Sequence, residues 1–152
     1  MSISKAKQQP IRLPASGKRE LRTQFGALCY RIRDGKVKIL MITTRSKKRW
    51  IVPKGWPMDK ATPGEAAARE AFEEAGVEGN ITSNCLGIYS YTRDVEGDNL
   101  PCVVALFPLK VKRLHAIYPE KGQRKRKWLS RKKAAALVDN PELRQMIENF
   151  DP

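Results

Sequence analysis

Apolar and polar residues alternate in a strand-like pattern on both sides of one clearly bounded helical segment. Residues 24–33 and 36–43 are rich in apolar residues, and the pair Asp34-Gly35 between them is typical of a tight turn, so we expect a β-hairpin. Further apolar runs predict strands at residues 50–52, 81–91, 101–111 and 125–129, with a turn-rich loop at 92–99.

The central helix has recognisable signals at both ends. Thr62 is a good N-cap, Pro63 suits the first helical position, and Glu65 completes a capping box. Gly76 is a typical left-handed stop. Two C-terminal helices are expected at 130–138, capped by Ser130, and at 141–150, capped by Asn140. This order of elements predicts an α/β fold, a mixed sheet with helices on both faces.

Three carboxylates lie within one turn of the central helix. Glu70, Glu73 and Glu74 stand at positions i, i+3 and i+4, so they share one side of the helix and repel one another. Oxygen ligands of this kind suit a hard divalent cation, Mg²⁺ or alternatively Mn²⁺. The competing interpretation is a solvent-exposed acidic face with Arg69 paired to Glu73.

The segment from Gly55 to Val77 resembles the Nudix box, in which a glycine precedes the pattern Arg-Glu-apolar-any-Glu-Glu-any-Gly-apolar. The resemblance covers roughly residues 22–149 and implies an α/β/α sandwich that hydrolyses phosphoanhydride bonds with a divalent metal. It implies metal ligands at Glu70, Glu73, Glu74 and the Gly55 carbonyl, and a catalytic set of Glu70, Arg69 and Glu73.

The match departs from the family at Ala61, where the family has a glutamate that supports the loop and the box arginine. Asp59 or Glu65 are the candidates to take over that role. The general base stays open. Glu70 is one choice, and a later acidic loop offers Asp94, Glu96 and Asp98.

The composition is that of one domain of ordinary size, with an unusually basic charge. The chain has 152 residues, 41% of them hydrophobic, and a formal net charge of +14. We expect a basic flexible arm at residues 1–19 and a single Nudix domain at 20–152. A charge this large implies a polyanionic partner, either a polyphosphorylated small molecule or nucleic acid.

Within the family the chain looks most similar to the diphosphoinositol polyphosphate and diadenosine polyphosphate phosphohydrolases, through residues 27–31, 43–45 and 50–53. That likeness implies a polyphosphorylated substrate held by Lys18, Arg22, Thr44, Arg45 and Lys54. One alternative is a non-catalytic or weakly catalytic module that binds RNA or polyphosphate, for which the basic run 121–133 is available. Another is a pyrophosphohydrolase that sanitises nucleotides or acts on RNA 5′ ends.

The remaining reactive residues predict no further site. Cys29, Cys85 and Cys102 lie in apolar segments and are expected to be buried, reduced thiols. His115, the only histidine, is expected on the surface in a loop or at a strand end. No apolar stretch suits a signal sequence or a membrane span, so we expect a cytoplasmic protein without an evident obligate protein partner.

Overall fold

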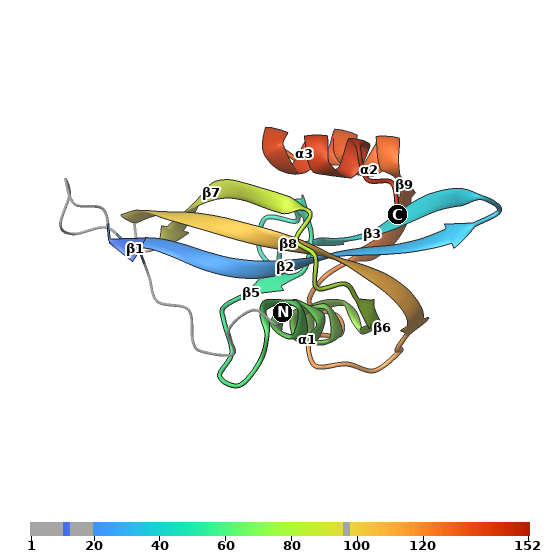
Figure 1. Ribbon diagram of the computed structural model, residues 1–152, viewed down its shortest axis with the longest axis horizontal. Coiled ribbons are helices and arrows are strands. Elements are labelled where there is room, and N and C mark those ends of the chain that lie inside the picture. Colours follow the sequence, from blue (N-terminus) through green and yellow to red (C-terminus); the bar gives the residue numbers. More distant parts are fainter. Residues whose placement is uncertain (1–10, 13–19, 96–97) are drawn as a thin grey trace.

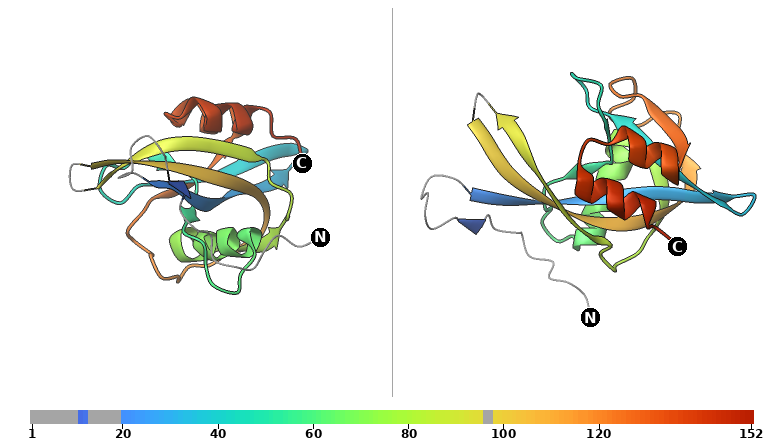
Figure 2. Two further views of the ribbon diagram at one scale, coloured as in Figure 1. Left: turned by 60° about the vertical axis from the view of Figure 1, so that its left-hand side comes forward. Right: turned by 90° about the horizontal axis from the view of Figure 1, so that it is seen from above.

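The computed structural model describes residues 11–12, 20–95 and 98–152, and in them a mixed sheet of nine strands lies between helices (Figure 1). Helix α1 covers one face of the sheet, and α2 and α3 lie together on the other face (Figure 2). The elements are β1 Ile11–Arg12, β2 Glu20–Arg33, β3 Lys36–Thr43, β4 Trp50–Ile51, β5 Lys54–Gly55, α1 Pro63–Ala75, β6 Val77–Ile81, β7 Gly87–Val95, β8 Asp98–Leu114, β9 Arg126–Ser130, α2 Arg131–Leu137 and α3 Pro141–Glu148. The predicted α/β class is confirmed.

The sheet is built around the long parallel pair of β2 and β8, and all its other strand pairs are antiparallel. Strand β3 pairs with β2 only from Tyr30 to Arg33 and then separates from it to pair with β4 and β9. Nearer its N-terminal end, at Phe25 and Gly26, β2 pairs with the short strand β5 instead. Strands β2 and β3 therefore form a fork, and the segment from Thr43 to Gly55 lies in it.

Apolar side chains form one core on each face of the sheet. On the α1 face, Phe25, Leu40 and Phe107 of the sheet meet the small side chains of Ala67 and Ala71. On the other face the helices α2 and α3 contribute Ala134, Ala135, Leu143 and Ile147 to a core that also contains Leu28, Met41 and Leu106. Alanines let α1 lie close to the sheet, which holds its carboxylates near the strands.

The predicted signals of α1 are all confirmed. The Thr62 hydroxyl accepts a hydrogen bond from the Glu65 amide at 3.1 Å, and the Glu65 carboxylate accepts one from the Thr62 amide at 2.8 Å. Gly76 adopts a left-handed conformation with φ of 69°, which a side chain would disfavour. Strong local signals therefore fix this helix at both ends.

Two predicted boundaries in the middle of the chain are wrong. The expected strand at 81–91 is in fact two strands, β6 and β7, separated by a bend at residues 82–86. The expected loop at 92–99 is largely strand, because β7 and β8 stay paired until Val95 lies opposite Asp98. Pairing with β8 along the whole ribbon outweighs the preference of these polar residues for turns.

The prediction for the cysteines is wrong for Cys85, which is exposed in the bend after β6, whereas Cys29 and Cys102 are buried. Burial raises the pKa of both buried thiols, which keeps them protonated.

His115 follows the end of β8 as expected, with Nε2 2.8 Å from the Glu78 carboxylate. Of the predicted N-terminal arm, residues 1–10 and 13–19 lie outside the described residues, while Ile11–Arg12 pairs with β2. Among the described helices, none is long and apolar enough to span a membrane.

Candidate active site

A polar cavity of about 420 Å³ lies where the fork meets α1. Its walls come from β2, the fork segment, α1, β7 and the loop that follows β8. The charged and polar side chains among its lining residues are Gln24, Thr44, Arg45, Ser46, Lys54, Glu70, Glu74, Tyr91, Arg93, Glu120 and Arg124. Carboxylates and cations therefore face one another across a single space.

Glu74 is the most enclosed carboxylate of the cavity, with 7% of its surface exposed. Its Oε1 accepts a hydrogen bond from the Lys54 amide at 3.4 Å, and its Oε2 lies 3.9 Å from Nη2 of Arg124. Burial raises the pKa of Glu74 to about 7, although the charges of Arg124 and Lys54 act in the opposite direction. The carboxylate thus ties the fork directly to α1.

Glu70 lies over Gly55, one turn before Glu74. A Cβ at position 55 would come within 2.6 Å of Glu70 Cγ and closer still to its carboxylate, so only glycine leaves room for this side chain. Burial raises the pKa of Glu70 to about 7, and the charges of Glu74, Glu73 and Glu120 and a hydrogen bond with Glu73 add to the effect. Gly55 and Glu70 are therefore fitted to each other.

Glu120 and Arg124 complete the cavity, and the sequence analysis missed both as site residues. The loop between β8 and β9 is held against the end of α1 by the amide of Glu120, which donates to the Glu73 carbonyl at 3.0 Å. Arg124 then donates to the Glu120 carboxylate at 3.0 Å and to the Thr43 carbonyl at 3.1 Å. The only sequence signal for this pair is its spacing. Glu120 stands four residues before Arg124, at the start of the basic run 121–133.

Three of the predicted substrate-binding residues line the cavity. Lys54 is largely enclosed, its Nζ lies 5.0 Å from the centre of the Tyr91 ring, and burial lowers its pKa. The Thr44 hydroxyl accepts a hydrogen bond from the Arg49 amide at 3.0 Å. Arg45 is exposed at the mouth, with Nη1 3.5 Å from Gln123 Oε1. Arg93 is a further cation of the cavity, and its guanidinium lies 5.1 Å from the Trp56 ring.

Other predicted residues do not line the cavity. Glu73 is half-buried beside Glu70, and Arg69 is exposed on α1, where it forms no hydrogen bond or ion pair with another described residue. Arg22 lies on β2 near Cys102, and its charge lowers the pKa of that thiol, although burial raises it more. Lys18 and Glu96 lie outside the described residues, as do the side chains of Asp94 and Asp98. The roles assigned to all of these residues stay predictions.

A divalent cation such as Mg²⁺ requires several oxygen ligands that converge on one point. Within the described residues, no three His, Cys, Asp or Glu side chains converge closely enough to form a ready metal site. The charges of Glu73, Glu74 and Glu120 nevertheless lie near enough to Glu70 to raise its pKa. Crowded oxygen donors of this kind fit a hard cation such as Mg²⁺, which would draw them together.

A second cavity of about 420 Å³ adjoins the first and shares Thr44, Ile51, Lys54 and Tyr91 with it. Its walls are more aromatic, because Trp50 and Tyr89 join Tyr91 there. The N-terminal end of α3 closes it with Asn140 and Pro141. Together the two cavities offer a charged compartment beside an aromatic one, a combination that suits a ligand with a polyphosphate and a ring.

The raised pKa values predict how stability depends on pH. Between about pH 4.5 and 7 the folded chain holds more protons on Glu70 and Glu74 than the unfolded chain does, so their contribution to stability is present at low pH and lost as pH rises. With chelator present, we expect the melting temperature to fall from pH 5 to 8 by several degrees more in the wild type than in the Glu70→Gln, Glu74→Gln variant. Equal pH profiles in thermal denaturation would contradict the burial of these charges.

Comparisons with known proteins agree with this architecture. The profile of the NUDIX domain matches residues 22–150. Nudix hydrolase 13, mitochondrial, from Arabidopsis thaliana is 36% identical over 123 residues, which cover 77% of this chain but only 61% of the relative. Human diphosphoinositol polyphosphate phosphohydrolase 3-alpha is 39% identical over 67 residues, 44% of this chain and 40% of the relative. A crystal structure of a C. elegans Ap4A hydrolase binary complex superposes with a TM-score of 0.63 at 21% identity, covering 84% of this chain and 93% of the other.

Proposed function

Because the chain belongs to the NUDIX domain family, we propose that it hydrolyses a phosphoanhydride bond in a polyphosphorylated substrate. The observation that carries the proposal is the single cavity in which the box carboxylates Glu70 and Glu74 face Arg45, Lys54 and Arg93. Cations hold the phosphates, while carboxylates hold the metal and accept a proton. Since the chain spans only part of the length of the first relatives it matches, the activity is inferred from this cavity rather than from their names.

The carboxylates of Glu70, Glu73 and Glu74, with the Gly55 carbonyl as a further ligand, would hold Mg²⁺ or Mn²⁺. The bound cation supplies Lewis-acid polarisation of the phosphoanhydride and lowers the pKa of a water ligand. The chain itself orients this set, because the Lys54 amide holds Glu74 and the absence of a side chain at Gly55 admits Glu70. Arg69 is proposed to assist from the outer side of the helix.

Two carboxylates are our candidates for accepting the proton of the attacking water. Glu70 has a pKa of about 7, which suits a base near neutral pH. Glu120 comes from the loop after β8 and is kept in position by Arg124 at 3.0 Å. We assign the role to Glu70, and Glu120 joins Asp94, Glu96 and Asp98 as a candidate from a later loop.

The adjoining cavity bears on the choice of substrate. Aromatic side chains such as Trp50 and Tyr91 stack on a planar base, so diadenosine polyphosphate is the preferred substrate in this proposal. The C. elegans Ap4A hydrolase shares the fold, which supports this choice only at the level of architecture. Diphosphoinositol polyphosphate is the second candidate, favoured by the name of the human relative and by the cations of the first cavity.

The test is phosphate release in the presence of Mg²⁺ from diadenosine hexaphosphate and from a diphosphoinositol polyphosphate. Wild type is compared with the Glu73→Gln, Glu74→Gln variant, which keeps side-chain size but removes two charges. We expect turnover of at least one substrate by the wild type and a loss of about 10³-fold or more in the variant. Zero turnover by both proteins would overturn the proposal and favour a module that only binds RNA or polyphosphate.

A further inference from the structure

The cavity does not account for the large positive charge of this chain. Its lining contains the cations Arg45, Lys54, Arg93 and Arg124 and the carboxylates Glu70, Glu74 and Glu120, which nearly balance. The formal net charge of the whole chain is +14. Most of the excess therefore lies elsewhere, and its distribution over the fold shows where a polyanion would be attracted.

The hairpin formed by β2 and β3 carries two opposed pairs of like charges. Arg31 lies directly opposite Lys38, and Arg33 lies opposite Lys36, so all four side chains share one face of the hairpin. Like charges in directly opposite positions destabilise a sheet. Among the described residues, no carboxylate forms an ion pair with any of these four. Stability of the hairpin alone does not explain this arrangement.

Arg31 is held in a fixed orientation on this face. Its guanidinium carbon lies 4.0 Å from the centre of the Trp128 ring, which stacks beneath it. Its Nε is buried and has no hydrogen-bond partner in the described part of the chain. Burial and the neighbouring charge of Arg33 lower its pKa. An anion placed against this face would relieve the mutual repulsion of these cations.

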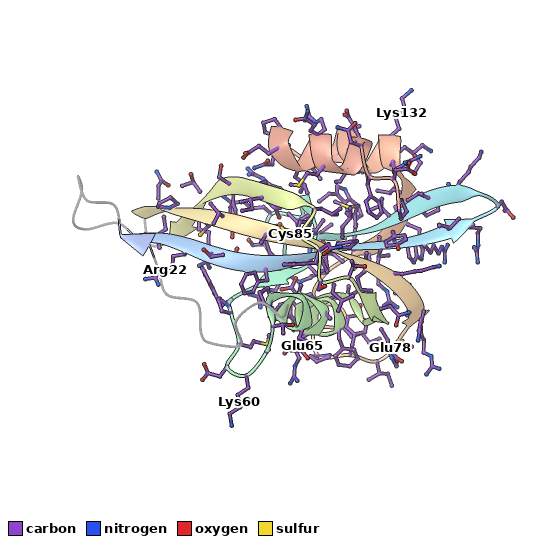
Figure 3. All side chains as sticks on the ribbon, in the orientation of Figure 1. Arg22, Lys60, Glu65, Glu78, Cys85 and Lys132 are labelled. Atoms are coloured by element: carbon purple, nitrogen blue, oxygen red, sulfur yellow. The ribbon has the colours of Figure 1, made fainter. Side chains whose placement is uncertain are left out.

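A groove of about 610 Å³ lies between the end of the hairpin at residues 35–38 and the start of α2. Lys36 and Lys38 form one side of the groove, and Arg131 and Lys132 form the other. Glu148 is the only carboxylate among its lining residues. Lys132 is exposed and projects from α2 away from the sheet (Figure 3). The groove shares no lining residue with either cavity at the fork.

We propose that the four cations that line this groove, Lys36, Lys38, Arg131 and Lys132, form a basic surface that binds the phosphate backbone of single-stranded RNA. Several cations spaced along a hollow match the regular charges of a nucleic-acid strand, which a compact anion would fill only in part. A flexible strand can follow a groove made by a hairpin and a helix, whereas a stiff duplex cannot bend into it. The surface binds independently of the reaction at the fork.

The experiment measures binding of a fluorescein-labelled, 5′-hydroxyl, 20-nucleotide RNA by fluorescence polarisation over a series of salt concentrations. This RNA has no phosphoanhydride bond, so it does not need the catalytic residues. The test variant is Lys36→Gln, Lys38→Gln, Lys132→Gln. We expect at least a roughly tenfold weaker Kd at low salt, a salt slope lower by about 2, and unchanged hydrolysis of the small-molecule substrate.

The matched control is Lys47→Gln, Lys48→Gln, Lys60→Gln, which removes the same charge from exposed positions outside the surface. Binding by the control should stay within about twofold of the wild type. Equal losses in both variants would show that overall charge alone attracts RNA and would overturn the proposal. It would also be overturned if the wild type bound no RNA, bound duplex DNA equally well, or bound only vesicles containing phosphatidylserine.

Discussion

Replacing Glu74 by glutamine is expected to reduce turnover by roughly 10³-fold while leaving the fold intact. Glutamine has almost the same shape and can still accept the hydrogen bond that the Lys54 amide donates at 3.4 Å. What it lacks is the negative charge that the metal requires. Steady-state kinetics with the preferred substrate, at several Mg²⁺ concentrations, would measure both the loss and the weaker dependence on metal.

The stability of this variant separates the charge from the packing. Because burial disfavours the ionised form of Glu74, the metal-free variant should be at least as stable as the wild type near pH 8. Glu65→Gln is a suitable control, since Glu65 is exposed on the same helix and glutamine also completes a capping box. Near-normal turnover in Glu74→Gln would remove this residue from the site.

The substitution Gly55→Ala is expected to reduce turnover by about 10²-fold or more, through Glu70 rather than through the backbone. The new methyl group would occupy the position of the Glu70 side chain, whose Cγ would lie only 2.6 Å away. Gly55 has no positive φ, so alanine itself fits the backbone. Glu70 can rotate aside, and we therefore expect a small change in melting temperature beside a large kinetic defect.

Gly87→Ala provides a matched control for this prediction. There too the added methyl group would meet a flexible side chain, with Met146 Sδ at 2.8 Å, but the position does not line either cavity at the fork. Similar stability changes in the two variants, with a kinetic defect only in Gly55→Ala, would support the fit between Gly55 and Glu70. Because the defect acts through Glu70, Gly55→Ala should cause no further loss of turnover in a Glu70→Ala background, and a further loss there would contradict the proposed cause.

The parts of the fold that could be predicted from sequence are those fixed by neighbouring residues. The ends of α1 depend on Thr62, Glu65 and Gly76, which act within one turn of the residues they cap. The hairpin turn at Asp34 and Gly35 is equally local. The break between β6 and β7 was missed, because pairing with distant β8 decides where both strands run.

The same distinction applies to the candidate site. Glu70 and Glu74 could be predicted because they share one side of a helix, and the cavity does bring them together. Glu120 and Arg124 could not, because a turn-containing loop brings them to α1 across more than forty residues of sequence. Arg69, which the sequence predicts to orient the carboxylates, is exposed on α1, and its role stays a prediction.

The fork between β2 and β3 also bears on how such an enzyme can evolve. The nine-residue ladder between β2 and β8 holds the centre of the sheet, and most of the core residues lie outside the segment in the fork, although Val52 from that segment is fully buried in one core. The segment is anchored by the short strands β4 and β5, by buried Val52 and by the Pro53 carbonyl, which accepts a hydrogen bond from the Ala27 amide at 3.0 Å, whereas its loop at residues 45–49 is exposed. Substitutions and insertions there would alter substrate preference while sparing the core, so new specificities can arise at little cost to folding.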